Sequence, residues 1–272
     1  MSDPSPLLKV MIAAAEAAGA SLAADFAALS ELEIIRKGPA DFVSAADLKA
    51  EEILRDRLAQ AYPRYGFLGE EGGHSAGEDA GVTFIADPLD GTTNFLCGNP
   101  LFGVNLALER DGELAAAVTL NPVLGEVYWA ERGCGAYLNG RRIRVSERAR
   151  LADAVLSVGI PFPGKDGHAL FAREMQALSA RAGGLRRLGS AAMDMAYVAA
   201  GRFDGFWERQ LNPWDLAPGA LLIVEAGGRA TAADGGPLDL HGGSVCATNG
   251  RFHEELLAQL AAAADKETLE CA

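Results

Sequence analysis

The stretch VTFIADPLDGTTNF, residues 82–95, determines how the rest of the chain is interpreted. Its first five residues form a short apolar run, which predicts a buried strand. Two carboxylates, Asp87 and Asp90, follow that strand directly. Pro88 stiffens the bend between them, and Gly91 permits a backbone angle that other residues avoid. Thr92 and Thr93 then offer hydroxyls and free N–H groups at the next turn.

This arrangement predicts a metal and an anion side by side. Carboxylates that converge at a strand end attract hard cations that prefer oxygen ligands. Backbone N–H groups at the following turn form a cradle for an anion such as phosphate. The fragment alone is equally compatible with a solvated turn, since Asp often bonds to its own backbone in loops. An EF-hand fits poorly because its other ligand positions and its closing Glu are missing.

Acidic residues elsewhere carry weaker signals when each is taken alone. Glu70 and Glu71 lie between glycines, in GEEGG at 69–73, which usually forms an exposed loop. Asp215 follows Trp214 at the start of an apolar segment, where an N-cap is the ordinary role of Asp. Asp47 comes three residues after Ser44, as in a capping box.

The first half of the chain predicts helices packed on a sheet. Apolar residues recur at helical spacing from Leu8 to Phe26, and a second helix is expected from after Ser44 to about Ala61, before Pro63. Strands are expected at 82–86, 102–108, 114–120 and 125–129, with turns at Asp111-Gly112 and Asn139-Gly140. We therefore expect an antiparallel or mixed sheet in residues 1–150.

The pattern changes to alternating strands and helices after about residue 152. Strands are expected at 155–159, 203–208 and 244–248. Helices are expected at 168–182, 191–200, 215–226 and 251–264, the third of them ending at Gly227-Gly228. Pro218 is expected in the first turn of the third helix, where its missing N–H has no consequence. Residues 151–272 thus form a second predicted part.

Composition excludes several classes of protein. The chain has 272 residues, 49% of them apolar, which is typical of a folded globular protein. Its formal net charge of −13 argues against nucleic acid and anionic membranes as partners. Four widely separated cysteines argue against a zinc site or a disulfide framework. The start of the chain does not read as a signal peptide, and we see no uninterrupted apolar run of the roughly 20 residues that span a bilayer, so a cytoplasmic location is expected.

The order of these motifs resembles the inositol monophosphatase family. Residues 87–95 contain the signature D-P-[IL]-D-G-T-x-N-F in full, and Trp214 to Gly219 matches a second signature, W-D-x-A-x-G. The G-E-E element lies at 69–71, and the resemblance runs from about Lys37 to about Gly228. It implies a layered α/β/α/β/α sandwich that hydrolyses a phosphate monoester with Mg²⁺, two or three ions per active site.

The resemblance also implies roles for individual residues. Glu70, Asp87 and the Leu89 carbonyl are expected to bind a first Mg²⁺, and Asp87, Asp90 and Asp215 a second. Glu70 is also expected to contact a third metal through water. Asp47 and Thr92 are expected to orient and deprotonate the attacking water. The N–H groups of Gly91 and Thr92 are expected to hold phosphate oxygens. The polyol is expected to be bound by these residues: Asp90, Gly189, Ser190, Ala191, Glu208 and Asp215.

The expected substrate is inositol monophosphate, a small phosphorylated polyol. Fructose-1,6-bisphosphate and other small sugar or nucleotide phosphates remain alternatives, because the metal core specifies the reaction type better than the substrate. A non-enzymatic binding module and a calcium-stabilised domain are the competing classes. The resemblance further implies a homodimer that is inhibited by lithium. Asp194 and the Arg186-Arg187 pair are additional candidates for contact with substrate, or for ordinary polar positions.

Overall fold

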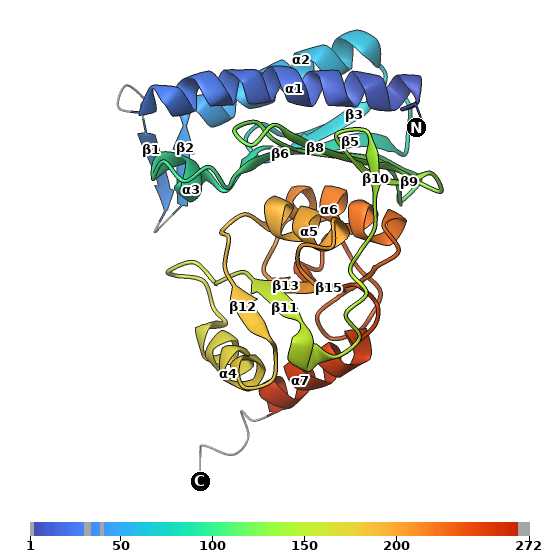
Figure 1. The fold of residues 1–272 in the computed structure, drawn as a ribbon. Helices are drawn as coiled ribbons and strands as arrows, with labels where there is room; N and C mark the ends of the chain where they lie inside the picture. Colours follow the sequence, from blue (N-terminus) through green and yellow to red (C-terminus); the bar gives the residue numbers. More distant parts are fainter. Residues whose placement is uncertain (1–2, 30–33, 39–40, 266–272) are drawn as a thin grey trace.

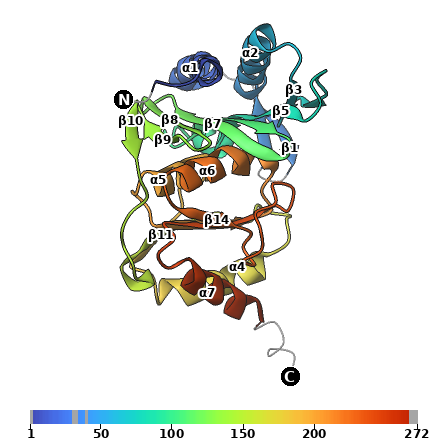
Figure 2. The same ribbon diagram turned by 90° about the vertical axis from the view of Figure 1, so that its right-hand side faces the viewer.

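The fold consists of five stacked layers, which alternate between helices and sheets (Figure 1, Figure 2). The computed structural model describes residues 3–29, 34–38 and 41–265, and only the backbone of residues 34–38 and 41–44. From one end to the other, the layers are α1 with α2, a large sheet, α5 with α6, a small sheet, and α4 with α7. The predicted α/β/α/β/α sandwich is confirmed.

The helices have the following bounds: α1 Pro6–Ala27, α2 Ala45–Ala61, α3 Thr92–Leu96, α4 His168–Ser179, α5 Ala191–Ala199, α6 Pro213–Glu225 and α7 His253–Asp265. The strands up to residue 143 are β1 Ile34–Gly38, β2 Asp41–Ser44, β3 Gly66–Gly69, β4 Gly73–Ser75, β5 Val82–Asp90, β6 Gly103–Arg110, β7 Glu113–Asn121, β8 Glu126–Glu131, β9 Gly135–Leu138 and β10 Arg141–Ile143. The later strands are β11 Val155–Val158, β12 Gly184–Arg186, β13 Gly205–Arg209, β14 Arg229–Thr231 and β15 Ser244–Thr248.

The large sheet has the order β10-β9-β8-β7-β6-β5-β3-β4. All its pairs are antiparallel except β3 with β5, so the expected mixed sheet is confirmed. Its tight turns follow the sequence signals. Asp111 and Gly112 have φ angles of 52° and 79°, and Asn139 and Gly140 have φ angles of 49° and 74°. Two-residue hairpin turns require such positive values.

One face of the large sheet is covered by α1 and α2. The apolar stripe of α1, including Leu8, Met11 and Leu22, is fully buried together with Leu54 and Leu58 of α2 and side chains of the sheet. Among the helices that the structure describes, α1 is the one long and apolar enough to cross a membrane. In the folded chain it instead lies flat beside α2 across the sheet (Figure 1).

The small sheet has the order β12-β11-β13-β15-β14, with β12, β11 and β13 parallel. Its outer face packs on α4 and α7, and its inner face packs on α5 and α6. Because α5 and α6 also contact the large sheet, one helical layer joins the two halves. The sheets lie on either side of residue 150 in the chain, but the division into two domains at that point stays a prediction.

The connection between the sheets is fixed by Asp204, which is fully buried. Its carboxylate accepts hydrogen bonds from Ser146 Oγ, from Arg148 Nη1 at 2.9 Å, and from the N–H of Val155 at 2.7 Å. These donors come from the connecting segment and from the first strand of the small sheet. A buried carboxylate with several donors therefore ties the crossing segment to that sheet.

The start of α6 differs from its expected position. The helix begins at Pro213, two residues earlier than predicted, and its N-cap is Asn212. Pro218 therefore lies inside the helix, and the expectation of a first-turn proline is wrong. Proline has no N–H for the carbonyl four residues earlier, which belongs to Trp214. Asn105 of β6, itself fully buried, donates to that carbonyl from Nδ2 at 3.3 Å. This hydrogen bond replaces the missing one and anchors α6 to the large sheet.

Candidate functional site

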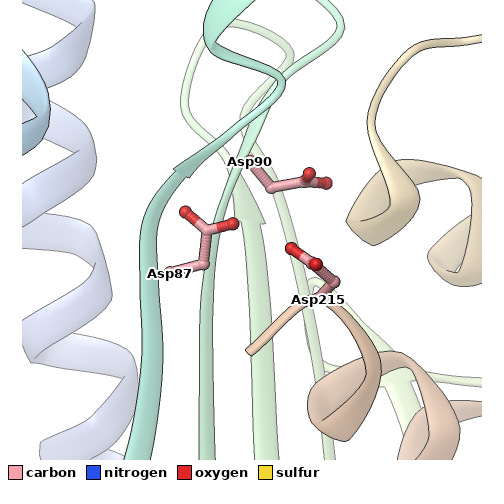
Figure 3. Close-up of side chains that lie close together, drawn as sticks. All are labelled: Asp87, Asp90 and Asp215. Atoms are coloured by element: carbon pink, nitrogen blue, oxygen red, sulfur yellow. The ribbon is translucent and has the colours of Figure 1, made fainter. Parts of the chain in front are cut away.

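Three carboxylates converge where β5 ends and α6 begins. Asp87 and Asp90 belong to β5, and Asp215 lies in the first turn of α6 (Figure 3). One oxygen from each lies within 4.8 Å of the others. Asp87 is buried, and Asp90 and Asp215 are half-buried. These residues, up to 128 positions apart in the chain, therefore form one cluster with the geometry of a cation site.

A bulge in β5 brings Asp87 and Asp90 to one side. In a regular strand, residues three apart point to opposite faces. Here Asp87 pairs with Asn105 and Asp90 with Gly103, so three steps along β5 oppose two steps along β6. The extra residue restores the two carboxylates to the same side. Pro88, which cannot donate to the sheet, lies inside this irregular stretch, as is usual for proline in strands.

Burial and mutual repulsion oppose ionisation of the cluster. The pKa of Asp87 lies well above its usual range, because burial and then the charges of Glu70, Asp90 and Asp215 disfavour the carboxylate. Burial also raises the pKa of Asp90, against opposing hydrogen bonds from Ser190 and Ala192. Burial and the Asp90 charge raise the pKa of Asp215 to about 7. Lys165 and Arg187 favour the charged forms of Asp215 and Asp90, but they do not cancel these effects.

Each carboxylate is held in place by at least one hydrogen bond. Asp87 Oδ1 accepts from the N–H of Leu89 at 2.8 Å. Asp90 Oδ2 accepts from Ser190 Oγ and from the N–H of Ala192, both at 2.6 Å. Asp215 Oδ2 accepts from the N–H of Asn212 at 2.7 Å. The Asx turn at Asp87 thus coexists with the cluster. Asp215 is not the N-cap that was the alternative to a metal role: the cap is Asn212, and Asp215 is the third helical residue.

Asp47 and Thr92 meet beside the cluster. Asp47 is buried in the first turn of α2, and Thr92 is the first residue of α3. Thr92 Oγ1 lies 3.2 Å from Asp47 Oδ1 and 3.2 Å from the Leu89 carbonyl oxygen. One hydroxyl proton thus has two candidate acceptors. Ser44, the other half of the capping box expected at Asp47, has a side chain outside the described part of the chain.

Glu70 lies in the same cleft but outside the tight cluster. Its charge raises the pKa of Asp87, and its N–H donates to the Ala86 carbonyl at 3.2 Å. The loop after Glu70 is fixed by Glu51 of α2, which is buried. The two Glu51 oxygens accept the N–H groups of Glu71 and Gly72, each at 2.8 Å. Glu51 was not anticipated, although an acid on the apolar face of a predicted helix is itself a signal.

A single cleft is lined by every predicted site residue except Asp47: Glu70, Asp87, Leu89, Asp90, Gly91, Thr92, Gly189, Ser190, Ala191, Glu208 and Asp215. Gly91 has a φ of 95°, and a Cβ there would lie 3.2 Å from both the Leu101 carbonyl oxygen and Ser190 Cβ. The first turn of α5 therefore packs directly against the Asp90-Gly91 turn.

The cleft is also lined by residues outside the predicted set. Arg187 and Asp194 were open candidates from the sequence, whereas Lys165, Arg209 and the exposed Phe162 were not singled out. Asn94 also escaped notice, although it belongs to the signature. It is buried, and its Nδ2 donates to the carbonyls of Leu101 and Leu188 at 2.6 and 2.8 Å, which ties α3 to the loop before Gly189.

The donor set suits a hard divalent cation. Carboxylate oxygens are the ligands that Mg²⁺ and Ca²⁺ prefer. Burial raises the pKa of all three carboxyls, and repulsion adds to this for Asp87 and Asp215. A bound cation would favour the ionised forms, which no cationic side chain within the described ranges restores. The residues present therefore fit a metal site of this type.

Comparisons with known proteins agree with this geometry. The inositol monophosphatase family model matches residues 3–267. An inositol-1-monophosphatase of Rhizobium meliloti is 53% identical, covering 90% of this chain and 92% of that protein. A relative named Nus factor SuhB, from Pseudomonas aeruginosa, is 41% identical, covering 93% and 94%.

A solved structure of a related protein has the same fold. The extragenic suppressor protein SuhB from Bartonella henselae superposes with a TM-score of 0.91 at 46% identity, covering 94% of this chain and 98% of that one. The motif order, the carboxylate cluster and these matches agree, and the chain belongs to the inositol monophosphatase family.

Proposed function

We propose that this protein is a Mg²⁺-dependent phosphatase that hydrolyses inositol monophosphate to inositol and phosphate. The observation that carries the proposal is the close approach of Asp87, Asp90 and Asp215 beside the turn at Gly91 and Thr92. Glu70 and the Leu89 carbonyl would complete the ligands, for two or three ions per site. Bound Mg²⁺ would lower the pKa of a water molecule and neutralise charge on the phosphoryl oxygens.

The protein's own groups would position the reactants. Asp47 would accept a hydrogen bond from the Thr92 hydroxyl, which would leave a lone pair on Thr92 Oγ1 to accept a hydrogen bond from the attacking water. The first N–H groups of α3 have no partner inside the helix and would hold phosphate oxygens. No covalent intermediate is required, because the displacement is in line and consists mainly of positioning and charge stabilisation.

The polyol would lie between Glu208 of β13 and the Gly189-Ser190-Ala191 turn, with Asp90 and Asp215 at its phosphate end. These residues line the same cleft. The Glu208 carboxylate would accept hydrogen bonds from ring hydroxyls. A substrate without those hydroxyls would leave a half-buried acceptor unpaired, which would give discrimination between phosphate esters.

Assembly and location extend the proposal. We expect a homodimer, as the family resemblance implies, and the cytoplasmic location that the sequence predicts. Some relatives carry the name Nus factor SuhB, so the absence of nucleic-acid binding stays a prediction, supported by the net charge of −13. A gel-shift assay at low salt with single-stranded RNA would test it.

A panel of phosphate esters tests the activity directly. Purified protein should release phosphate from inositol 1-phosphate in Mg²⁺ faster than from fructose-1,6-bisphosphate or 3′-phosphoadenosine 5′-phosphate. Ca²⁺ should not support turnover, because its larger and more flexible shell suits the site less well. Millimolar Li⁺ should inhibit. A preference for fructose-1,6-bisphosphate would transfer the proposal to the alternative substrate, and no phosphate release from any ester would refute it.

Substitution of Asp90 tests the cluster. Asp90→Asn should lower kcat for inositol 1-phosphate by at least about a hundredfold, the size expected when a group that stabilises transition-state charge is lost. The fold should persist, because the carboxamide oxygen can still accept from Ser190 or Ala192. Asp234→Asn, at an exposed turn, is the matched control and should leave kcat unchanged. A fully active Asp90→Asn protein would contradict the assignment.

Removal of metal should make stability depend on pH. The raised pKa values mean that the folded protein holds protons more tightly than the unfolded chain does. This stabilisation is therefore complete below about pH 4 and is lost as the pH rises through about 7, at about 1.4 kcal/mol per pH unit for one group.

Thermal unfolding in EDTA at pH 5 and pH 8 measures this decline. Saturating Mg²⁺ should restore Tm at pH 8, because bound cations stabilise the ionised cluster. Asp215→Asn should show a smaller decline in EDTA. Equal Tm values with EDTA and with Mg²⁺ at pH 8 would argue against a cation site.

A further inference from the structure

The end of β13 presents alternate side chains to two different layers. Phe206 packs among α5 and α6, whereas Trp207 packs among α4 and α7. Because side chains alternate along a strand, Glu208 and Arg209 continue this pattern. Glu208 lines the cleft beside α5 and α6, and its two neighbours along the strand point toward α4.

Both of those neighbours bond to a single carboxylate, that of Glu174 in α4. Glu174 is only 2% exposed. Its Oε2 accepts from Trp207 Nε1 at 3.1 Å, and its Oε1 accepts from Arg209 Nε at 3.1 Å and Nη2 at 2.7 Å. Three hydrogen bonds thus fix the residues immediately before and after Glu208. They also direct the Arg209 guanidinium to Glu174, although Arg209 borders the same cleft as Glu208.

The Glu208 side chain also lies very close to the backbone of Gly159. A Cβ on Gly159, just past the end of β11, would lie 1.7 Å from Glu208 Cδ. Only glycine leaves room there for the carboxylate. The N–H of Gly159 also donates to the Trp207 carbonyl at 3.3 Å, which continues the pairing of β11 with β13. The Glu208 carboxylate therefore lies against the Gly159 backbone, while the residues before and after it are bonded to Glu174.

We propose that Glu174 is a positioning residue for substrate discrimination: through Trp207 and Arg209 it holds the end of β13 so that the Glu208 carboxylate faces the polyol. This inference rests on the proposed function, in which Glu208 accepts ring hydroxyls. Glu174 itself does not touch the substrate. Loss of its charge would loosen the strand end and release the Arg209 guanidinium, which could then pair with Glu208 and block its acceptor oxygens.

Kinetics on two substrates test this role. Glu174→Gln should raise KM for inositol 1-phosphate about tenfold, the size expected for loss of one charge-assisted hydrogen bond. It should leave kcat and KM for 4-nitrophenyl phosphate, which has no ring hydroxyls, within about twofold of wild type. Trp207→Phe, which removes the indole donor together with part of the buried ring, should act in the same direction. Arg173→Ala is the control on the same helix, since Arg173 Nε donates instead to the Ala263 carbonyl of α7.

A double-mutant cycle separates positioning from general destabilisation. If Glu174 acts through Glu208, Glu174→Gln should add no further increase in KM to a Glu208→Gln protein. Equal increases in both backgrounds, or equal losses on both substrates, would overturn the inference. A wild-type protein that hydrolyses neither ester would refute the proposed function itself, and the role of Glu174 with it. An active wild type whose Glu174→Gln variant matches Arg173→Ala would overturn the inference alone.

Discussion

The repulsion among Asp87, Asp90 and Asp215 is the constraint on which the rest of the structure depends. Three carboxylates whose oxygens lie within 4.8 Å of one another oppose their own assembly when they are ionised. The fold therefore has to hold them by other means. Leu89, Ala192 and Asn212 each donate a backbone N–H to one carboxylate oxygen. Asp87 and Asp215 are thus bound to their own segments of chain, and Asp90 is bound to the start of α5. A divalent cation would then convert the remaining repulsion into attraction.

The layered architecture explains how residues so distant in sequence meet. β5 of the large sheet ends beside the N-termini of α5 and α6, the two helices that lie between the sheets (Figure 1). Helix N-termini carry a partial positive charge, which favours acidic groups there. Asn105 sets the distance between β5 and α6, because it pairs with Asp87 across the sheet and bonds the Trp214 carbonyl next to Asp215. A single asparagine thus relates two members of the cluster.

Much of this could be predicted from the sequence, because its local signals are strong. The helical spacing in α1, the turn residues Asp111-Gly112 and Asn139-Gly140, and the apolar run before Asp87 each indicate an element that the structure contains. The site residues could be predicted because the motif order identified the family, and all of them except Asp47 line one cleft.

Contacts between residues far apart in the sequence could not be predicted in this way. Glu51, Asn105 and Glu174 bond to backbone or side chains 20 to 109 residues away, and no local period encodes such a pairing. The start of α6 was misplaced because we expected Asp215 to be the N-cap, which also put Pro218 in the first turn. The cap is Asn212, and Asn105 bonds the carbonyl that Pro218 leaves without a helical donor.

We attribute catalysis to a bound cation, and substrate discrimination to the Glu208 carboxylate that Glu174 positions. The first claim is the central one, and anomalous diffraction tests it most directly. Crystals soaked in Mn²⁺, which takes the same oxygen ligands as Mg²⁺, should give an anomalous peak at the centre of Asp87, Asp90 and Asp215. Carboxylates that point apart, with no peak between them at saturating Mn²⁺, would contradict the account.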